Sequence, residues 1–296
     1  MPDTRHFYID GAWVPPAAPR DHPVIDPSTE EAFATVSLGS AADADRAVAA
    51  ARAAQPGWAA TPPAERRAIV ARLMEAYEAR KEDLAQAISR AMGAPIDFAR
   101  DQQAPSLPYA LKPFLAAFDR IEWVRPVDPS TPHSVVLMEP VGVAALITPW
   151  NWPTSQIALK AIPAMLAGCA CVLKPSEESP LDAIVFAELC DAAGVPPGVF
   201  NLVNGDGAGV GARLSAHPDV DMVSFTGSTR AGRAITLAAA QTLKRVTLEL
   251  GGKGANLIFA DADDRAVERG VRHMMNNAGQ SCNAPSRMLV ERRIYD

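Results

Sequence analysis

The sequence predicts an α/β protein whose core is a doubly wound, Rossmann-like parallel sheet. Between residues 143 and 249, short apolar segments alternate regularly with helical ones, and the apolar segments end in polar or glycine-containing turns. Strands separated by helices are typical of βαβ units in a parallel sheet covered on both faces. Ligands of such sheets bind at the carboxyl ends of the strands. We expect strands at residues 143–148, 169–174, 199–203, 222–226 and 245–249, and helices at 155–167, 180–193, 208–215 and 229–242.

Smaller elements precede and follow this sheet. Asp10-Gly11 lies between two apolar pairs and predicts a hairpin, which would form an N-terminal β appendage with a second β unit near residues 24–36. Ser40 followed by Asp43 predicts an N-cap, and Gln55-Pro56-Gly57 is expected to end that helix. Further elements are expected as helices over residues 61–93 and 99–118, a two-stranded excursion over 123–139, and a strand, helix and strand over 255–259, 263–276 and 287–290.

Composition argues against several classes of function. Lys and Arg number 28 against 34 Asp and Glu, which gives a net charge of -6 without a basic run, so nucleic acid is not an expected partner. The four cysteines have neither the density of a disulfide scaffold nor the spacing of a zinc site, so we expect no metal and a reducing cytoplasm.

The N-terminus lacks the basic segment followed by an apolar segment that is typical of a signal peptide. The longest apolar run, residues 161–173, is shorter than the ~20 residues that span a bilayer, so no membrane association is expected.

Cys282 is the candidate nucleophile. It ends the polar, glycine-containing loop 276–282, which follows a predicted helix. A thiolate needs an oxyanion donor and a base, so a lone cysteine is a candidate only if such partners exist elsewhere in the chain. The alternative is that Cys282 is a small packed residue, because free cysteine is among the most buried residue types.

Two strand ends supply such partners. Asn151 lies between tryptophans and prolines in Pro149-Trp150-Asn151-Trp152-Pro153, and its amide could donate to an oxyanion or bond only to its own turn. Glu249 ends a strand before Gly251-Gly252, where it could serve as a general base or remain an exposed strand-end glutamate.

Two further strand ends suit a dinucleotide. Gly227 and Ser228 stand at a strand-to-helix junction, where free backbone N–H groups and the helix dipole favour an anion, although a tight turn explains the spacing equally well. Lys174 and Glu177 follow another strand and could donate to and accept from ribose hydroxyls, or form a solvated charged turn.

Taken together and in this order, these motifs resemble the NAD(P)-dependent aldehyde dehydrogenase superfamily. The resemblance covers essentially the whole chain and rests on five stretches: residues 149–153, Lys174-Pro175-Ser176-Glu177, Phe225-Thr226-Gly227-Ser228, Glu249-Leu250-Gly251-Gly252-Lys253 and Gly279-Gln280-Ser281-Cys282.

The resemblance implies a role for each residue. Cys282 would attack an aldehyde, Asn151 would hold the oxyanion, and Glu249 would activate the water that hydrolyses the thioester to a carboxylic acid. NAD would be the cofactor, with NADP possible, since Glu177 would accept from a ribose 2′-hydroxyl and repel a 2′-phosphate. The cofactor-binding residues would be Thr148, Trp150, Lys174, Glu177, Gly227 and Ser228.

The resemblance also implies an organisation. Residues 1–122 and 140–249 would form the NAD-binding domain, 123–139 an oligomerisation hairpin of a homo-oligomer, and 250–296 the start of a catalytic domain. Family members continue well beyond the cysteine loop, so we expect a fragment, a disrupted gene product or half of a split enzyme, inactive by itself. Two alternatives stay open: a non-catalytic dinucleotide-binding fragment, and a CoA-acylating or phosphate-reductase relative.

Overall fold

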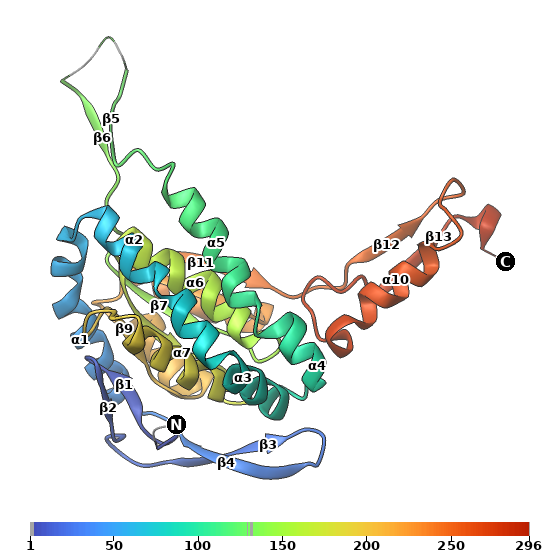
Figure 1. Ribbon diagram of the computed structural model, residues 1–296, viewed down its shortest axis with the longest axis horizontal. Helices are drawn as coiled ribbons and strands as arrows, with labels where there is room; N and C mark the ends of the chain where they lie inside the picture. Colours follow the sequence, from blue (N-terminus) through green and yellow to red (C-terminus); the bar gives the residue numbers. More distant parts are fainter. Residues whose placement is uncertain (1–2, 129, 131–132, 296) are drawn as a thin grey trace.

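The fold is organised around one seven-stranded sheet (Figure 1). The computed structural model describes residues 3–128, 130 and 133–295. Five strands of the sheet run parallel, as the alternating pattern predicts, and an antiparallel pair completes one edge. The strand order is β11 (Arg245–Leu250), β10 (Met222–Gly227), β7 (Val143–Ile147), β8 (Ala170–Lys174), β9 (Phe200–Leu202), β1 (Phe7–Ile9) and β2 (Ala12–Val14).

Helices cover both faces of the sheet because successive strand residues point to opposite sides. On β7, Ala144 and Leu146 pack into one apolar cluster, whereas Val143, Ala145 and Ile147 pack into the other. The first face is covered by α3 (Leu73–Met92), α5 (Ser106–Phe118), α6 (Pro153–Ala167) and α7 (Leu181–Ala192). The second is covered by α1 (Ala41–Ala60), α8 (Ala212–Ala216) and α9 (Thr229–Ala240), with the short turn η2 (Gly207–Gly211) before α8.

The predicted start of α1 is confirmed, but its predicted end is wrong. Ser40 and Asp43 form a reciprocal capping box. The helix runs past Pro56 to Ala60 because Trp58 is buried and its Nε1 donates to the Met165 carbonyl at 3.0 Å. This tertiary contact holds a turn that the Pro-Gly sequence would otherwise interrupt.

The next predicted helices are each interrupted. The segment 61–93 forms α2 (Pro63–Ala71) and α3, which meet at Arg72, and Gly93 ends α3 with a φ of +79°. The segment 99–118 forms the π-helical turn η1 (Ala99–Gln103) and α5, after the short α4 (Ile96–Phe98).

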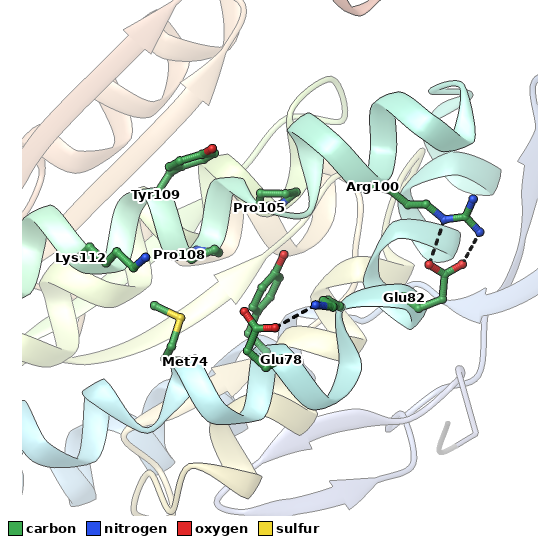
Figure 2. A pocket seen from close by; sticks show the side chains of 10 residues that line it. Met74, Glu78, Glu82, Arg100, Pro105, Pro108, Tyr109 and Lys112 are labelled. Atoms are coloured by element: carbon green, nitrogen blue, oxygen red, sulfur yellow. Dashed lines mark hydrogen bonds and ion pairs between the residues drawn. The ribbon is translucent and has the colours of Figure 1, made fainter.

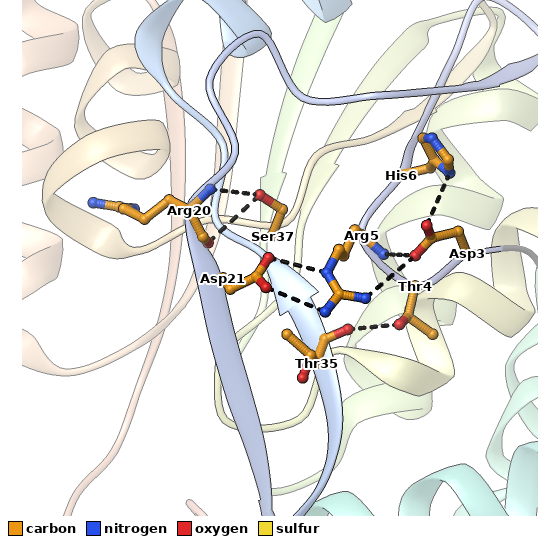
Figure 3. A network of polar contacts seen from close by, with 8 residues as sticks. All are labelled: Asp3, Thr4, Arg5, His6, Arg20, Asp21, Thr35 and Ser37. Carbon is orange, nitrogen blue, oxygen red and sulfur yellow. Dashed lines mark hydrogen bonds and ion pairs between the residues drawn. The ribbon is translucent and has the colours of Figure 1, made fainter.

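The N-terminal hairpin is confirmed, but it is part of the main sheet rather than an appendage. Tyr8 pairs with Leu202, a contact between residues too distant in sequence for local patterning to reveal. The second β unit, β3 (Asp21–Asp26) with β4 (Glu31–Ser37), forms a separate pair. Figure 3 shows its ties to the N-terminal segment: Arg5 Nε donates to Asp21 at 3.0 Å, and the Thr4 hydroxyl donates to the Thr35 carbonyl at 2.6 Å.

Two β units project from the body (Figure 1). The predicted two-stranded unit over 123–139 is confirmed as an antiparallel pair of β5 (Val124–Pro126) and β6 (Val135–Leu137). Residues 129, 131 and 132 of the predicted range lie outside the described residues. At the other end of the chain, β12 (Ala255–Ile258) pairs parallel with β13 (Arg287–Val290). The helix between them is α10 (Ala266–Met275), followed by the turn η3 (Asn276–Gly279), and η4 (Arg292–Ile294) follows β13.

Candidate active site

The turns after β7, β10 and β11 meet the cysteine loop in one cleft of about 520 Å³. The cleft therefore unites residues that the sequence places far apart, including the candidate nucleophile and the candidate oxyanion donor. The predicted residues that line it are Trp150, Asn151, Gly227, Ser228 and Cys282.

Asn151 holds the cysteine loop directly. Its Nδ2 donates to the Gln280 carbonyl at 2.7 Å. A side-chain amide carries two N–H donors, so one hydrogen fixes the loop and the second remains for another acceptor. The neighbouring Trp152 adds a second link, because its Nε1 donates to the Ser281 hydroxyl at 2.8 Å. The two acceptor residues, Gln280 and Ser281, immediately precede Cys282 in the chain.

The backbone of the loop has an unusual conformation. Asn277, Ala278 and Gly279 have φ values of 53°, 54° and 76°, so three successive residues are left-handed. Such residues are costly outside glycine and persist where the surrounding structure determines them. Cys282, three residues after this segment, is exposed. Cys169, Cys171 and Cys190 are buried, and burial raises the pKa of each of these three thiols.

Ser228 begins α9 at the edge of the cleft. Its Oγ accepts from the Ala231 N–H at 3.2 Å, so it is the N-cap of a 12-residue helix. The hydroxyl keeps its own hydrogen for another partner. A helix start with unpaired N–H groups and a free hydroxyl suits an anion such as phosphate.

A second cavity, of about 640 Å³, lies between the β10–α9 junction and the η2–α8 segment. Its walls include Ile147, Phe225 and Ile235, and two carboxylates, Glu177 and Asp206, line it as well. Burial raises the pKa of Asp206, but the Gly209 N–H and Arg20 outweigh burial, so the net shift is downward. An apolar slot of this size with a few polar groups fits a nucleoside, and its acidic residues disfavour an added phosphate.

The structure places Lys174 differently from a free ribose donor. The residue is 2% exposed, and its Nζ donates to the carbonyls of Pro175 and Gly205, both at 2.6 Å, and to Glu177 at 3.4 Å. These three acceptors use all three ammonium donors. Burial lowers the pKa of Lys174, and the charge of Glu177 opposes that shift. Lys174 thus orients Glu177, which is the group that faces the cavity.

Thr148 lies between residues that line the two cavities. It is buried, and its hydroxyl has no hydrogen-bond partner among the described residues. A buried hydroxyl without a partner is unusual in proteins, so this one is available to a ligand.

Comparison with known proteins agrees with these motifs. The family model described as "Aldehyde dehydrogenase family" matches residues 13–296. The chain belongs to the aldehyde dehydrogenase family. A 3-succinoylsemialdehyde-pyridine dehydrogenase from a Pseudomonas species is 53% identical over 292 residues, which are 98% of this chain and 60% of that protein.

Solved aldehyde dehydrogenase structures share the fold. The enzyme from Bartonella henselae is 55% identical with a TM-score of 0.98, over 100% of this chain and 62% of that one. Aldehyde Dehydrogenase C from Pseudomonas syringae, a cysteine-to-alanine mutant in complex with NAD+ and octanal, is 51% identical with a TM-score of 0.95, over 99% of this chain and 60% of that one. The chain thus spans about 60% of the length of these relatives.

Glu249 lies outside the residues that line the cleft. It is exposed on the edge strand β11, opposite Thr226 of β10. Thr226 donates to Gln156 of α6 at 2.9 Å, so Glu249 points to the face of the sheet that α6 covers. Lys160 of α6 is buried on that face; burial lowers its pKa to about 8 against the charge of Glu249.

Sequence reasoning missed three residues that shape the site: Gln103, Trp152 and Asn277. Trp152 lies in the 149–153 motif and Asn277 in the 276–282 loop, but the sequence predicts no separate role for either residue. Nothing in the sequence pointed to Gln103, because a glutamine in a helical segment is ordinarily solvent-exposed.

No helix in the described part of the chain has the length and apolarity needed to cross a bilayer.

Proposed function

We propose that this chain carries the cofactor-binding and nucleophile-bearing part of an aldehyde dehydrogenase that oxidises an aldehyde to a carboxylic acid with NAD. The observation that carries the proposal is the 2.7 Å bond from Asn151 to the loop of Cys282, within the cleft that the start of α9 also lines. A nucleophile, an amide donor and an anion-binding helix end in one cleft match the needs of this reaction.

The residues would act in sequence. Cys282 Sγ attacks the carbonyl carbon, and the oxygen that gains charge is held by the Asn151 amide and the Cys282 backbone N–H. Bound NAD would supply the acceptor for the hydride that this carbon loses. The sulfur then remains bonded to an acyl carbon as a thioester, and a water that gives its proton to Glu249 breaks the C–S bond to release the acid and the thiol.

Glu249 supports the hydrolytic branch over CoA acylation. Its exposed position on β11 leaves it outside the cleft lining, so the proposal requires its side chain to reach a water beside Cys282. Lys160 of α6 lies on the same face of the sheet as Glu249.

The cofactor would occupy both cavities. The start of α9 with Ser228 would hold the pyrophosphate, Glu177 would accept from the adenosine ribose, and Trp150 and Gly227 would wall the groove. Support comes from NAD+-bound aldehyde dehydrogenases with the same fold. The two acidic residues of the nucleoside cavity, Glu177 and Asp206, support NAD over NADP.

The proposed organisation keeps residues 1–122 and 140–249 as the NAD-binding domain and 250–296 as the beginning of the catalytic domain. Residues 123–139 would mediate homo-oligomer formation, since Val124, Val135 and Leu137 of this hairpin are at least half exposed, at 62%, 50% and 56%. Four unpaired cysteines fit a reducing cytoplasm.

A chimera tests the proposal. This chain would be fused to the part of the Bartonella henselae enzyme that lies outside the matched region, and aldehyde-dependent NADH formation would be followed at 340 nm. We expect turnover, and Asn151→Ala should lower kcat by about 10²-fold or more, the usual cost of one oxyanion donor. A folded chimera that binds NAD but never reduces it would favour the non-catalytic dinucleotide-binding alternative.

A further inference from the structure

A buried glutamine links the two segments that carry the candidate catalytic residues. Gln103 is the last residue of η1, whose π-helical turn is closed by the Ala104 N–H and the Ala99 carbonyl at 2.9 Å. The side chain is 0% exposed. Its Nε2 donates to the Asn151 carbonyl at 3.1 Å and to the Asn277 Oδ1 at 2.9 Å. π-helical turns are frequent at functional sites, where they redirect a side chain.

Asn277 completes the network. Its Nδ2 donates to the Asn151 carbonyl at 2.8 Å and to the Gln280 carbonyl at 3.2 Å. The Asn151 carbonyl therefore receives two amide donors, while the Asn151 side chain binds the Gln280 carbonyl. Together these bonds fix the turn after β7 against the left-handed segment of the cysteine loop.

The other side of η1 is anchored to α3. Arg100 donates to Glu82 through Nε at 3.0 Å and Nη2 at 2.7 Å, a two-point contact that Figure 2 shows beside the groove between α3 and α5. The turn is thus held from outside by an ion pair while Gln103 points inward. Gln103 touches Asn151 and Asn277 but is not among the residues that line the cleft.

We propose that Gln103 is a positioning residue, whose amide sets the separation between the Asn151 turn and the Cys282 loop. The proposal rests on the function proposed above for Asn151 and Cys282. The Asn151 amide and the Cys282 N–H must converge on one oxygen, and a displacement of about 1 Å can cost about 10²-fold in rate.

Stability alone does not explain a glutamine here. Its Oε1 is buried without a partner among the described residues. An unpaired buried acceptor is unfavourable, and an apolar side chain of similar size would avoid it. Of the Gln103 amide, only the Nε2 group, which donates, makes hydrogen bonds among the described residues.

Hydrogen exchange of the full chain tests the positioning role without requiring turnover. The test variant is Gln103→Met, which keeps the length of the side chain and removes its donor. The control is Gln102→Met, the exposed neighbour on the same turn. Two amides report the opening of the loop: that of Gln280, which donates to the Asn277 carbonyl, and that of Ala284, which donates from just beyond the loop to the Ser281 carbonyl. Their exchange should accelerate about fivefold for each net hydrogen bond lost, with exchange in β7 and β8 unchanged.

Kinetics of the chimera give the second readout. Gln103→Met should lower kcat by about 10²-fold without changing the KM for NAD, whereas Gln102→Met should change neither. The positioning role is overturned if loop exchange in Gln103→Met equals that of the control, or if exchange rises equally throughout the chain. It is also overturned if kcat is unchanged. A wild-type chimera without activity would refute the proposed function instead, and the exchange data would still decide the role of Gln103.

Discussion

Asp182 gives the fold a pH dependence that can be worked out from its surroundings. The residue lies in the first turn of α7 and is 0% exposed. One carboxylate oxygen accepts from the Thr154 hydroxyl at 2.9 Å, and the other has no partner among the described residues. Burial raises the pKa of Asp182 to about 7, against the lowering effect of Thr154 and of the backbone N–H groups. Thr154 stands at the start of α6, close after the Asn151 turn.

The sign and size of the effect follow from linkage. The folded chain binds this proton more tightly than the unfolded chain, so the stabilisation is fully present below pH 3.8 and is lost as the pH rises through about 7. The difference between 3.8 and about 7 corresponds to roughly 4 kcal/mol at ~1.4 kcal/mol per pH unit. Asp182→Asn, which stays neutral, should therefore gain stability relative to wild type across this window, by up to about 4 kcal/mol.

Urea unfolding at a series of pH values from 4 to 8 measures this difference. Asp264→Asn, an exposed carboxylate without a hydrogen bond among the described residues, controls for the loss of one acidic group. Subtracting the control should leave a difference that grows from pH 4 to pH 7 and then levels. A difference that stays flat, or that shrinks as the pH rises, would refute the reasoning.

Three other outcomes follow from the site. Glu177→Gln should weaken the preference for NAD over NADP by about tenfold, because it removes a carboxylate that repels a 2′-phosphate. Titrating the chimera with each cofactor measures the ratio of the two affinities, and an unchanged ratio would assign the preference to other residues. Glu249→Gln should give one equivalent of NADH in a stopped-flow burst and then stall, and steady turnover would remove Glu249 from the role of base. Lys160→Met should raise the free energy of unfolding at pH 7, because it removes a buried charge. This gain should disappear as the pH rises from about 8 to 10.5, since Lys160 then becomes neutral in the folded chain and finally in the unfolded chain as well. A gain that persists at pH 10.5 would contradict this reasoning.

The sequence predicted the parallel sheet well because each strand is an apolar run between turn signals. β7, β8, β9, β10 and β11 lie within one or two residues of the expected bounds. The convergence of Asn151 with Gly227 and Ser228 was also predictable, since these residues follow strands, and parallel sheets bind ligands at the carboxyl ends of their strands. Cys282 follows a helix, so its place beside Asn151 was expected only from the resemblance to a family.

Contacts between distant segments could not be predicted from local patterns. The pairing of Tyr8 with Leu202 and the anchoring of Trp58 by Met165 join residues that no short-range signal relates. Lys174 illustrates the same limit in the site, because the Gly205 carbonyl that occupies its ammonium follows a different strand. Gln103 shows the same limit, since the direction of its side chain depends on a π-helical turn that a helical sequence pattern does not reveal.

The measurement that tests the central claim most directly is the mass of the Cys282 peptide during reaction. The Glu249→Gln chimera would be mixed with NAD and an aldehyde, quenched in acid and digested. We predict an acyl group on Cys282, in amounts equal to the NADH formed, and neither adduct nor NADH when Cys282→Ser is added to the variant. NADH formed without acyl-Cys282, or formed equally by the Cys282→Ser protein, would contradict the account.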